Sequence, residues 1–264
     1  MINKLIISDI NDLPIKYWKE VPGLQNKNEI EFSPGLNIIV GPNGSGKSTL
    51  LNLIRKTFLC ENSYYSCYTK DSINNLCKNI NIFEKNNSDY GYHGYDFVHD
   101  GNPVFCFDAS TSIGIENGAF TDFMVDGINN MFSKKGSSSG QNIIYELNTM
   151  FQYSLKVNEI QDNIGITSVN DTWKNKIKTA QRIIGNPGIN KSKITILLDE
   201  PTVNLDFIVE MYLWEMLEKH SEKYQIIIAT HSIGLLKRFK CDVKIIEMKD
   251  GYIDKMKKSL RKIF

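Results

Sequence analysis

The stretch Gly41-Pro42-Asn43-Gly44-Ser45-Gly46-Lys47-Ser48-Thr49 decides how the rest of the chain is interpreted. It matches the phosphate-loop pattern G-x-x-x-x-G-K-[ST] at every required position. The apolar run at residues 36–40 predicts a buried strand before it, and apolar residues at helical spacing in 49–54 predict a helix after it. Such a loop points successive N–H groups and the positive end of the helix dipole at phosphate oxygens. We therefore predict a nucleoside triphosphate site.

The side chains of this loop have distinct predicted tasks. Lys47 is expected to reach the β- and γ-phosphates, and the Ser48 hydroxyl is expected to ligate Mg²⁺. The other residues predicted to bind the nucleotide are Asn43, Gly44, Ser45, Gly46 and Thr49. Tyr17 or Trp18, in the loop before this stretch, either stacks on the base or anchors the loop by packing. The predicted cofactors are ATP and Mg²⁺.

Composition limits the class of protein. A chain of 264 residues with 41% hydrophobic residues is long enough for one large α/β domain. The net charge of +1 excludes an overall field that drives binding to nucleic acid or anionic lipid. The five cysteines contain no C-x-x-C pair, which argues against a disulfide framework and a zinc site. Without a signal peptide or an apolar run of membrane-spanning length, the expected location is the cytoplasm.

A second strand carries acids to its end. The apolar run at residues 194–198 predicts a buried strand that delivers Asp199 and Glu200, and Pro201 then stops it. Two acids at the tip of a buried strand are costly unless a cation lies there. We predict that Asp199 holds Mg²⁺ through water and that Glu200 orients or deprotonates the attacking water.

Two further polar residues follow predicted strands. Asp108 ends the apolar run at 104–107 and is expected to face the metal or the attacking water, although a loop cap fits equally well. His231 follows the apolar run at 225–229. It would report on a γ-phosphate or hold the catalytic water, whereas a lone histidine is more often structural.

The remaining elements complete a sheet. Residues 5–8 and 29–32 predict two antiparallel strands of a side sheet. Asp206 predicts the cap of a helix that ends near residue 220, with an inner face of Phe207, Met211, Trp214 and Leu217. Residues 243–253 predict a closing hairpin, and 254–264 predict a basic helix that is either a solvated face or a docking tail.

A second loop of small residues precedes another predicted helix. Ser137-Ser138-Ser139-Gly140-Gln141 is followed by apolar residues on one helical face, namely Ile143, Ile144, Leu147, Met150, Phe151 and Leu155. Hydroxyls and free amides at a helix N-terminus suit an anion. By itself this signal is weak, because such loops are usually flexible connectors.

The order of these motifs, over residues 5–253, resembles the ATP-binding cassette (ABC) family. Residues 137–141 resemble a degenerate form of that family's Leu-Ser-Gly-Gly-Gln signature. The resemblance implies a single α/β domain with a P-loop NTPase fold: a mixed or parallel central sheet, an antiparallel side sheet and a helical signature subdomain. It also implies that Glu200 is the catalytic base and His231 the γ-phosphate switch.

The resemblance implies a homodimer as well. The signature of the family acts in trans, so Ser138, Gly140 and Gln141 of one chain would close on the ATP of the other. Asp206 would belong to the loop that crosses the dimer interface. ATP would thus lie between two copies of this chain.

Departures from the family narrow the expected function. No glutamine occurs between Lys47 and Gln141, a variable region lies at about 60–100, and an insertion lies at about 156–192. Long coiled-coil arms are absent. The chain therefore resembles the compact, armless branch related to chromosome-maintenance and RecF-like ATPases, including ATPase subunits of bacterial anti-phage systems.

This branch suggests an ATP-hydrolysing switch that controls a nuclease or toxic effector. The alternative is the nucleotide-binding subunit of an ABC membrane transporter, which would bind a permease. Nucleic acid remains a further candidate partner, and because lysines outnumber arginines its binding should be sensitive to salt and indifferent to sequence.

Overall fold

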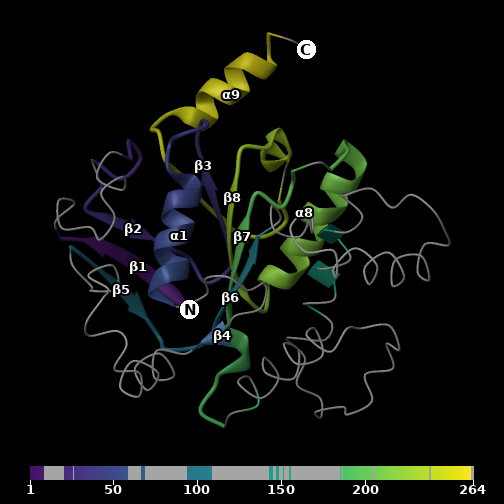
Figure 1. Ribbon diagram of the computed structural model, residues 1–264. Helices are drawn as coiled ribbons and strands as arrows, with labels where there is room; N and C mark the ends of the chain where they lie inside the picture. Colours follow the sequence, from purple (N-terminus) through teal and green to yellow (C-terminus); the bar gives the residue numbers. More distant parts are fainter. Residues whose placement is uncertain are drawn as a thin grey trace, which may run out of the picture.

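Two sheets organise the chain (Figure 1). The computed structural model describes residues 1–8, 21–25, 27–58, 67–68, 94–108, 187–203, 205–237 and 239–262, and also 143–144, 147–148, 151, 155 and 185. Within these residues, a six-stranded sheet has the order β4-β6-β7-β8-β3-β9, and a three-stranded sheet has the order β2-β1-β5. This is the P-loop NTPase arrangement that the sequence predicts.

The central sheet is parallel except for one short strand at its edge. Its strands are β3 (Leu36–Val40), β6 (Val104–Asp108), β7 (Thr195–Asp199), β8 (Gln225–Thr230) and β9 (Val243–Glu247), with β4 (Cys67–Tyr68) antiparallel to β6. Continuous apolar runs in β3, β7 and β8 suit strands that are covered on both faces. The carboxyl ends of the parallel strands share one edge, where ligands bind in open α/β sheets.

The side sheet is antiparallel, as predicted. Its central strand β1 (Ile2–Ile7) pairs with β2 (Glu29–Glu31) and with β5 (Tyr95–His99). The third strand, β5, lies in the variable region at about 60–100, where the sequence predicts no strand. Its partner in β1 is distant along the chain, so local periodicity carries little information about the pairing.

Alternate side chains of the central strands enter two apolar cores. Ile39, Leu197 and Ile227 pack with α1 (Lys47–Thr57) and the side sheet. Ile38, Leu198 and Ile228 pack with α8 (Phe207–Ser221) on the opposite face. Five residues of the predicted helix after the serine-glycine loop are buried in this second core, namely Ile143, Ile144, Leu147, Phe151 and Leu155.

The inner face of α8 differs from the sequence prediction at its first turn. Trp214 and Leu217 are buried as predicted, but Phe207 is 64% exposed. The position facing inward in this turn is instead Glu210, whose side chain is buried. The predicted cap is present, because Asp206 Oδ1 accepts hydrogen bonds from the N–H groups of Ile208 and Val209.

One buried amide ties the two sheets together. The side chain of Gln225, at the start of β8, accepts hydrogen bonds from Ile2 N–H and Thr195 Oγ1, each at 2.7 Å. Its Nε2 donates to Ile2 O at 2.7 Å and to Ser33 O at 2.8 Å. Both ends of this fully buried side chain are therefore satisfied, so β1 is fixed in position against β8.

The predicted closing hairpin is wrong. β9 runs parallel to β3, and the chain then turns into a helix, α9 (Tyr252–Leu260). Gly251 takes a left-handed conformation, and Glu247 accepts the N–H groups of Gly251 and Ile253 at 2.7 and 2.8 Å, which satisfies two amides at the helix start. Figure 1 shows α9 beyond the ends of β3 and β8. No helix among the described residues is long and apolar enough to cross a membrane.

Candidate functional site

The phosphate loop joins β3 to α1 and needs glycine at two positions. Gly46 has φ of +98°, and a Cβ atom there would lie 1.9 Å from Val21 Cγ1. Gly44 has φ of +75° and open space around it. L side chains rarely adopt this backbone conformation, so both positions require glycine for the loop to keep its curl.

The cation of the loop is held inside it. Lys47 is only 6% exposed, and its Nζ donates to the carbonyl oxygens of Gly41 at 3.1 Å and Pro42 at 3.3 Å. Ser45 Oγ is buried and has no hydrogen-bond partner among the described residues. A buried ammonium and an unsatisfied hydroxyl in one loop suit an anionic ligand rich in oxygen. The loop residues therefore fit the phosphates of ATP.

Two oxygen ligands meet where the start of α1 faces the end of β7. Ser48 Oγ, in the first turn of α1, donates to Asp199 Oδ1 at 3.1 Å. The described residues contain no cluster of three or more His, Cys, Asp or Glu side chains that would hold a metal by themselves. Mg²⁺ typically takes one or two protein oxygens and completes its shell with water and phosphate. The pair of Ser48 and Asp199 fits that requirement.

Glu200 follows directly and is held in an unusual conformation. Its φ is +45°, and it is the one described residue other than glycine with a positive φ. Its N–H donates to Ala229 O at 2.9 Å, which fixes the turn against β8. Such a conformation costs about 1–3 kcal/mol and persists where surrounding structure imposes it, commonly at functional sites.

The Glu200 carboxylate lies between two basic groups. Oε1 is 3.7 Å from Lys47 Nζ, and Oε2 is 3.0 Å from His231 Nδ1. These two atoms form no hydrogen bond, and Oε2 is buried without a hydrogen-bond partner among the described residues. A buried carboxylate oxygen of this kind has capacity to accept a hydrogen bond from a water molecule.

His231 leaves the end of β8 and is 51% exposed. The backbone around it is anchored by hydroxyl groups. Thr230 Oγ1 lies 2.9 Å from Thr202 Oγ1 and accepts the Ser232 N–H at 3.1 Å. The histidine ring is therefore presented at the carboxyl edge of the central sheet by a backbone that is fixed on both sides.

Other predicted site residues are placed less completely. Asp206 is exposed at the N-terminus of α8 and acts there as the cap. The backbone of Asp108 pairs with Asp199 at the end of β6, but its side chain lies outside the described residues. Ser138, Gly140, Gln141, Tyr17 and Trp18 also lie outside them. Their predicted roles remain predictions.

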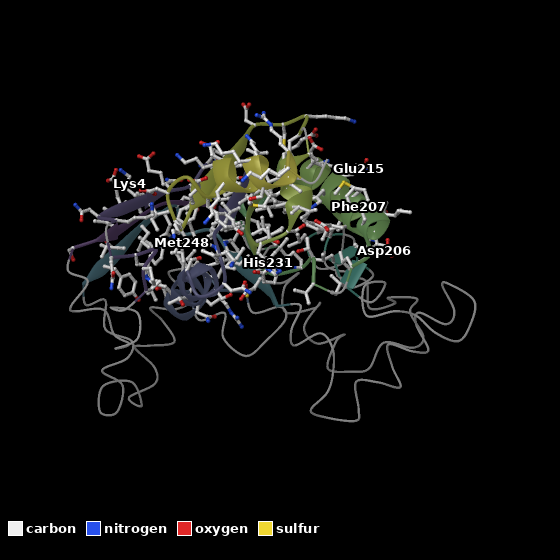
Figure 2. All side chains as sticks on the ribbon, turned by 90° about the horizontal axis from the view of Figure 1, so that it is seen from above. Lys4, Asp206, Phe207, Glu215, His231 and Met248 are labelled. Carbon is white, nitrogen blue, oxygen red and sulfur yellow. The ribbon has the colours of Figure 1, made fainter. Side chains whose placement is uncertain are left out.

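Figure 2 looks onto this edge of the sheet, and His231 lies between Met248 and Asp206 in that view. Met248 is buried, and its N–H donates to Val40 O at 2.7 Å at the start of the phosphate loop. The structure thus brings together Lys47, Ser48, Asp199, Glu200 and His231, which lie in three separate segments of the chain. Sequence reasoning missed Glu210, which reaches the segment after His231.

Comparison with protein families assigns the chain. Residues 14–263 match the AAA domain family AAA_23. This chain belongs to that family. The AAA domain spans nearly all of the sequence, and the site geometry above fits a nucleotide-binding domain. Membership of this family implies nucleotide hydrolysis.

Solved structures similar to this AAA domain include two ATP-binding cassettes. One is MJ0796, a dimer in a post-hydrolysis state bound to ADP and phosphate, with 17% identity over 84% of this chain and 86% of that chain and a TM-score of 0.37. The other is cbiO1 from Clostridium perfringens, part of the ABC transporter complex cbiONQ, with 18% identity over 89% and 85% and a TM-score of 0.36. A comparison with curated proteins finds no match.

Proposed function

We propose that this AAA domain is a cytoplasmic ATP-hydrolysing switch that dimerises around ATP and controls a partner effector, a nuclease or toxin, in anti-phage defence. The observation that carries the hydrolytic part is the position of Glu200. Its strained backbone directs one carboxylate oxygen toward Lys47 and leaves the other with free acceptor capacity. A module that only stores ATP has no need of a carboxylate held in this way.

The side chains divide the reaction between them. Lys47 neutralises charge on the β- and γ-phosphates, and Ser48 with Asp199 would hold Mg²⁺, which supplies further charge neutralisation when bound. Glu200 Oε2 accepts a proton from water as the water oxygen attacks the γ-phosphorus atom. The bond from that atom to the β–γ bridging oxygen breaks, and ADP and phosphate leave. His231 lies close enough to hold the same water or a γ-phosphate oxygen.

Exposed apolar side chains support the proposed homodimer. Among the described residues, five of the eight large exposed apolar side chains lie in the segments that follow Glu200 and His231, namely Val203, Phe207, Ile208, Tyr212 and Ile233. An apolar surface beside a catalytic edge favours association there. In this dimer Ser138, Gly140 and Gln141 of one chain complete the site of the other, and Asp206 lies in the loop between the two chains.

The charge of α9 supports an anionic partner or an acidic docking surface. The helix and its end carry exposed cationic side chains at Lys255, Lys257, Lys258, Arg261 and Lys262, and none of them forms an ion pair with another described residue. Nucleic acid bound here would be held by phosphate contacts and would dissociate as salt increases. The missing arms and the insertion at 156–192 leave a separate effector protein as the principal expected partner.

The test uses Glu200→Gln, which keeps size but removes the base. Phosphate release should fall at least about 100-fold, because general base catalysis typically contributes this much. Light scattering should show a dimer of this variant in Mg-ATP and a monomer in ADP. Lys47→Ala should neither hydrolyse nor dimerise, and Glu215→Gln, an exposed change on α8, should behave as wild type. A Glu200→Gln protein that stays monomeric in Mg-ATP would contradict the proposed dimer, in which ATP lies between two chains.

The Glu200→Gln variant, which is expected to bind ATP without hydrolysing it, also tests which partner this chain binds. Tagged Glu200→Gln protein, purified from its own cells in Mg-ATP, should retain a soluble effector or nucleic acid that Lys47→Ala does not retain. Recovery of a membrane protein with several spans would replace the effector with a permease and make this chain a transporter subunit.

A further inference from the structure

Glu210 is the buried charge that the hydrolytic site does not use. Three charged side chains are buried among the described residues: Lys47, Glu210 and Glu218. Lys47 and Glu218 each have an oppositely charged group within 4 Å. Glu210 forms no ion pair within the described part of the chain. A buried carboxylate without a cation is costly, so its retention calls for a specific reason.

The hydrogen bonds of Glu210 lead to the segment that carries His231. Its Oε1 accepts hydrogen bonds from Trp214 Nε1, at 2.9 Å within α8, and from Ser232 Oγ. Ser232 is the residue after His231. Its Oγ also accepts the N–H of Gly234 at 2.9 Å, which caps the short helix η6 (Ile233–Leu236). Glu210 therefore fixes the hydroxyl on which the turn after His231 is built.

The turn after His231 packs closely against Glu210 and Trp214. A Cβ atom on Gly234 would lie 2.1 Å from Glu210 Oε1 and 2.7 Å from Trp214 Nε1. Trp214 is fully buried and meets Phe239 edge to face, with ring centroids 5.7 Å apart. The turn thus rests directly on the carboxylate and the indole, and a side chain at residue 234 would displace one of them.

The network continues to the turn of Glu200. Ser232 N–H donates to Thr230 Oγ1, and Thr230 Oγ1 lies 2.9 Å from Thr202 Oγ1. Thr202 follows Glu200 closely in the chain, and His231 Nδ1 lies 3.0 Å from Glu200 Oε2. Polar contacts therefore run from α8 through both residues that flank His231 to the turn after the predicted base.

We propose that Glu210 is a positioning residue: through Ser232 it holds His231 against Glu200 and couples the first turn of α8 to the catalytic edge. The assignment rests on the proposed ATP hydrolysis. Asp206, which caps α8 and lies in the proposed dimer interface, is one turn before Glu210, and Glu210 N–H donates to Asp206 O at 2.9 Å. Closure of the dimer at Asp206 is thereby transmitted to the histidine.

The simpler explanation is a favourable interaction with the helix dipole. An acid in the first turn stabilises a helix without any role in chemistry. That role needs a carboxylate near the amides of the helix start. The carboxylate of Glu210 instead binds a side chain of the next helical turn and a side chain of another segment.

The test compares Glu210→Ala and Glu210→Gln with Glu215→Ala as the matched control. Glu215 lies on the same helix and is exposed at the surface in Figure 2. Without nucleotide, hydrogen exchange of residues 231–237 should become at least about 10-fold faster in Glu210→Ala, because the Ser232 and Gly234 amides lose their anchor. Exchange in β3 should not change. Glu210→Gln keeps an acceptor oxygen and should retain near wild-type exchange.

Kinetics then separate positioning from simple stability. Measured well below the melting temperature, kcat of Glu210→Ala should fall about 10- to 100-fold with KM for ATP changed less than about threefold. Glu210→Gln should restore most of kcat. The double variant Glu210→Ala/His231→Ala should be no slower than His231→Ala, because both changes remove the same contribution. A double variant in which the two losses multiply overturns the proposal.

Failure of this proposal is distinguishable from failure of the proposed function. If wild type hydrolyses ATP and Glu210→Ala loses neither kcat nor exchange protection, Glu210 is not a positioning residue. If wild type shows no turnover, ATP hydrolysis is wrong, and the exchange measurement alone decides whether Glu210 holds the segment after His231. Should Glu210→Ala not fold, Ser232→Ala removes the same link and leaves the contact between Glu210 and Trp214 intact.

Discussion

The two ends of α8 hold the same loop in different ways. At the C-terminal end, Glu218 lies 3.0 Å from Lys237 Nζ and also accepts the backbone N–H groups of Lys240 and Cys241. Burial alone would raise the pKa of Glu218, but these hydrogen bonds and the lysine charge outweigh it and lower the pKa. This end combines charge pairing with full hydrogen bonding.

The N-terminal end lacks the matching charge. Glu210 is equally buried but binds only hydrogen-bond donors, Trp214 and Ser232, within the described residues. The difference teaches that burial does not by itself assign a role. A carboxylate with a cation stabilises the fold, whereas one without a cation that lies beside a catalytic edge is a candidate for function.

The largest expected effect on stability is at the paired end. Replacing Glu218 by Ala leaves Lys237 and two N–H groups without their partner, so the free energy of unfolding should fall by about 3–5 kcal/mol. ATP turnover per folded molecule should not change. Urea denaturation followed by circular dichroism measures the first quantity and phosphate release the second. A Glu218→Ala protein with unchanged stability and reduced turnover would show that Glu218, like Glu210, acts on the reaction and not on the fold.

A smaller loss is expected where the loop meets Glu210. Gly234→Ala places a methyl group where no space exists, so it should destabilise by about 1–3 kcal/mol and also lower kcat. Gly35→Ala is the matched control, because its nearest neighbour would be an oxygen atom 3.6 Å away. Thermal unfolding and steady-state kinetics of both variants test the comparison. Unchanged kcat in Gly234→Ala would mean that the turn tolerates displacement.

Acid should weaken the paired end. The pKa of Glu218 is lowered in the folded state, so its contribution is fully present above its ordinary pKa of 4.5 and is lost as pH falls through the folded-state pKa. Below about pH 4.5, stability should therefore decline less steeply in Glu218→Gln than in wild type. Urea midpoints between pH 3 and 7 measure this. Parallel curves would show that other acids dominate the decline.

The smallest effect on stability is expected at the start of α8. Ile208 is 79% exposed, so Ile208→Ser should change the free energy of unfolding by no more than about 0.5 kcal/mol. It should nevertheless weaken the ATP-dependent dimer of the Glu200→Gln protein, as sedimentation would show. Val98→Ser, on the side sheet, is the control that leaves the dimer intact. If Ile208→Ser and Val98→Ser weaken the dimer equally, the proposed dimer interface does not lie at the start of α8.

The sequence predicts well what depends on local pattern. Two segments combine a motif with continuous apolar runs: the strand, loop and helix around Lys47, and the strand that ends at Asp199 and Glu200. Their secondary structure can therefore be predicted without knowing what packs against them. The pairing of Ser48 with Asp199 follows from the parallel order of β3 and β7 on one edge. These parts of the fold and site required no structure.

The errors arise where distant contacts override the local pattern. Tyr252 and Ile253 after a glycine turn suggest a return strand, but Glu247 caps a helix there and Ile253 packs into the core. The apolar spacing places Phe207 on the inner face, yet Asp206 fixes the start of α8 so that Glu210 points inward. The only signal for Glu210 is its spacing of one turn from Asp206 and Trp214, which does not reveal the contact with Ser232.

The amide of Gln225 has a consequence for synthesis of the chain. It holds the backbone of Ile2, from which it is separated by 223 positions. At bacterial elongation rates, β1 leaves the ribosome roughly 10–45 s before its anchor is made. During that interval β1 can pair with β2 and β5, which are made earlier, but it lacks the amide that fixes it against β8. The side sheet can therefore assemble before it is fixed against the central sheet.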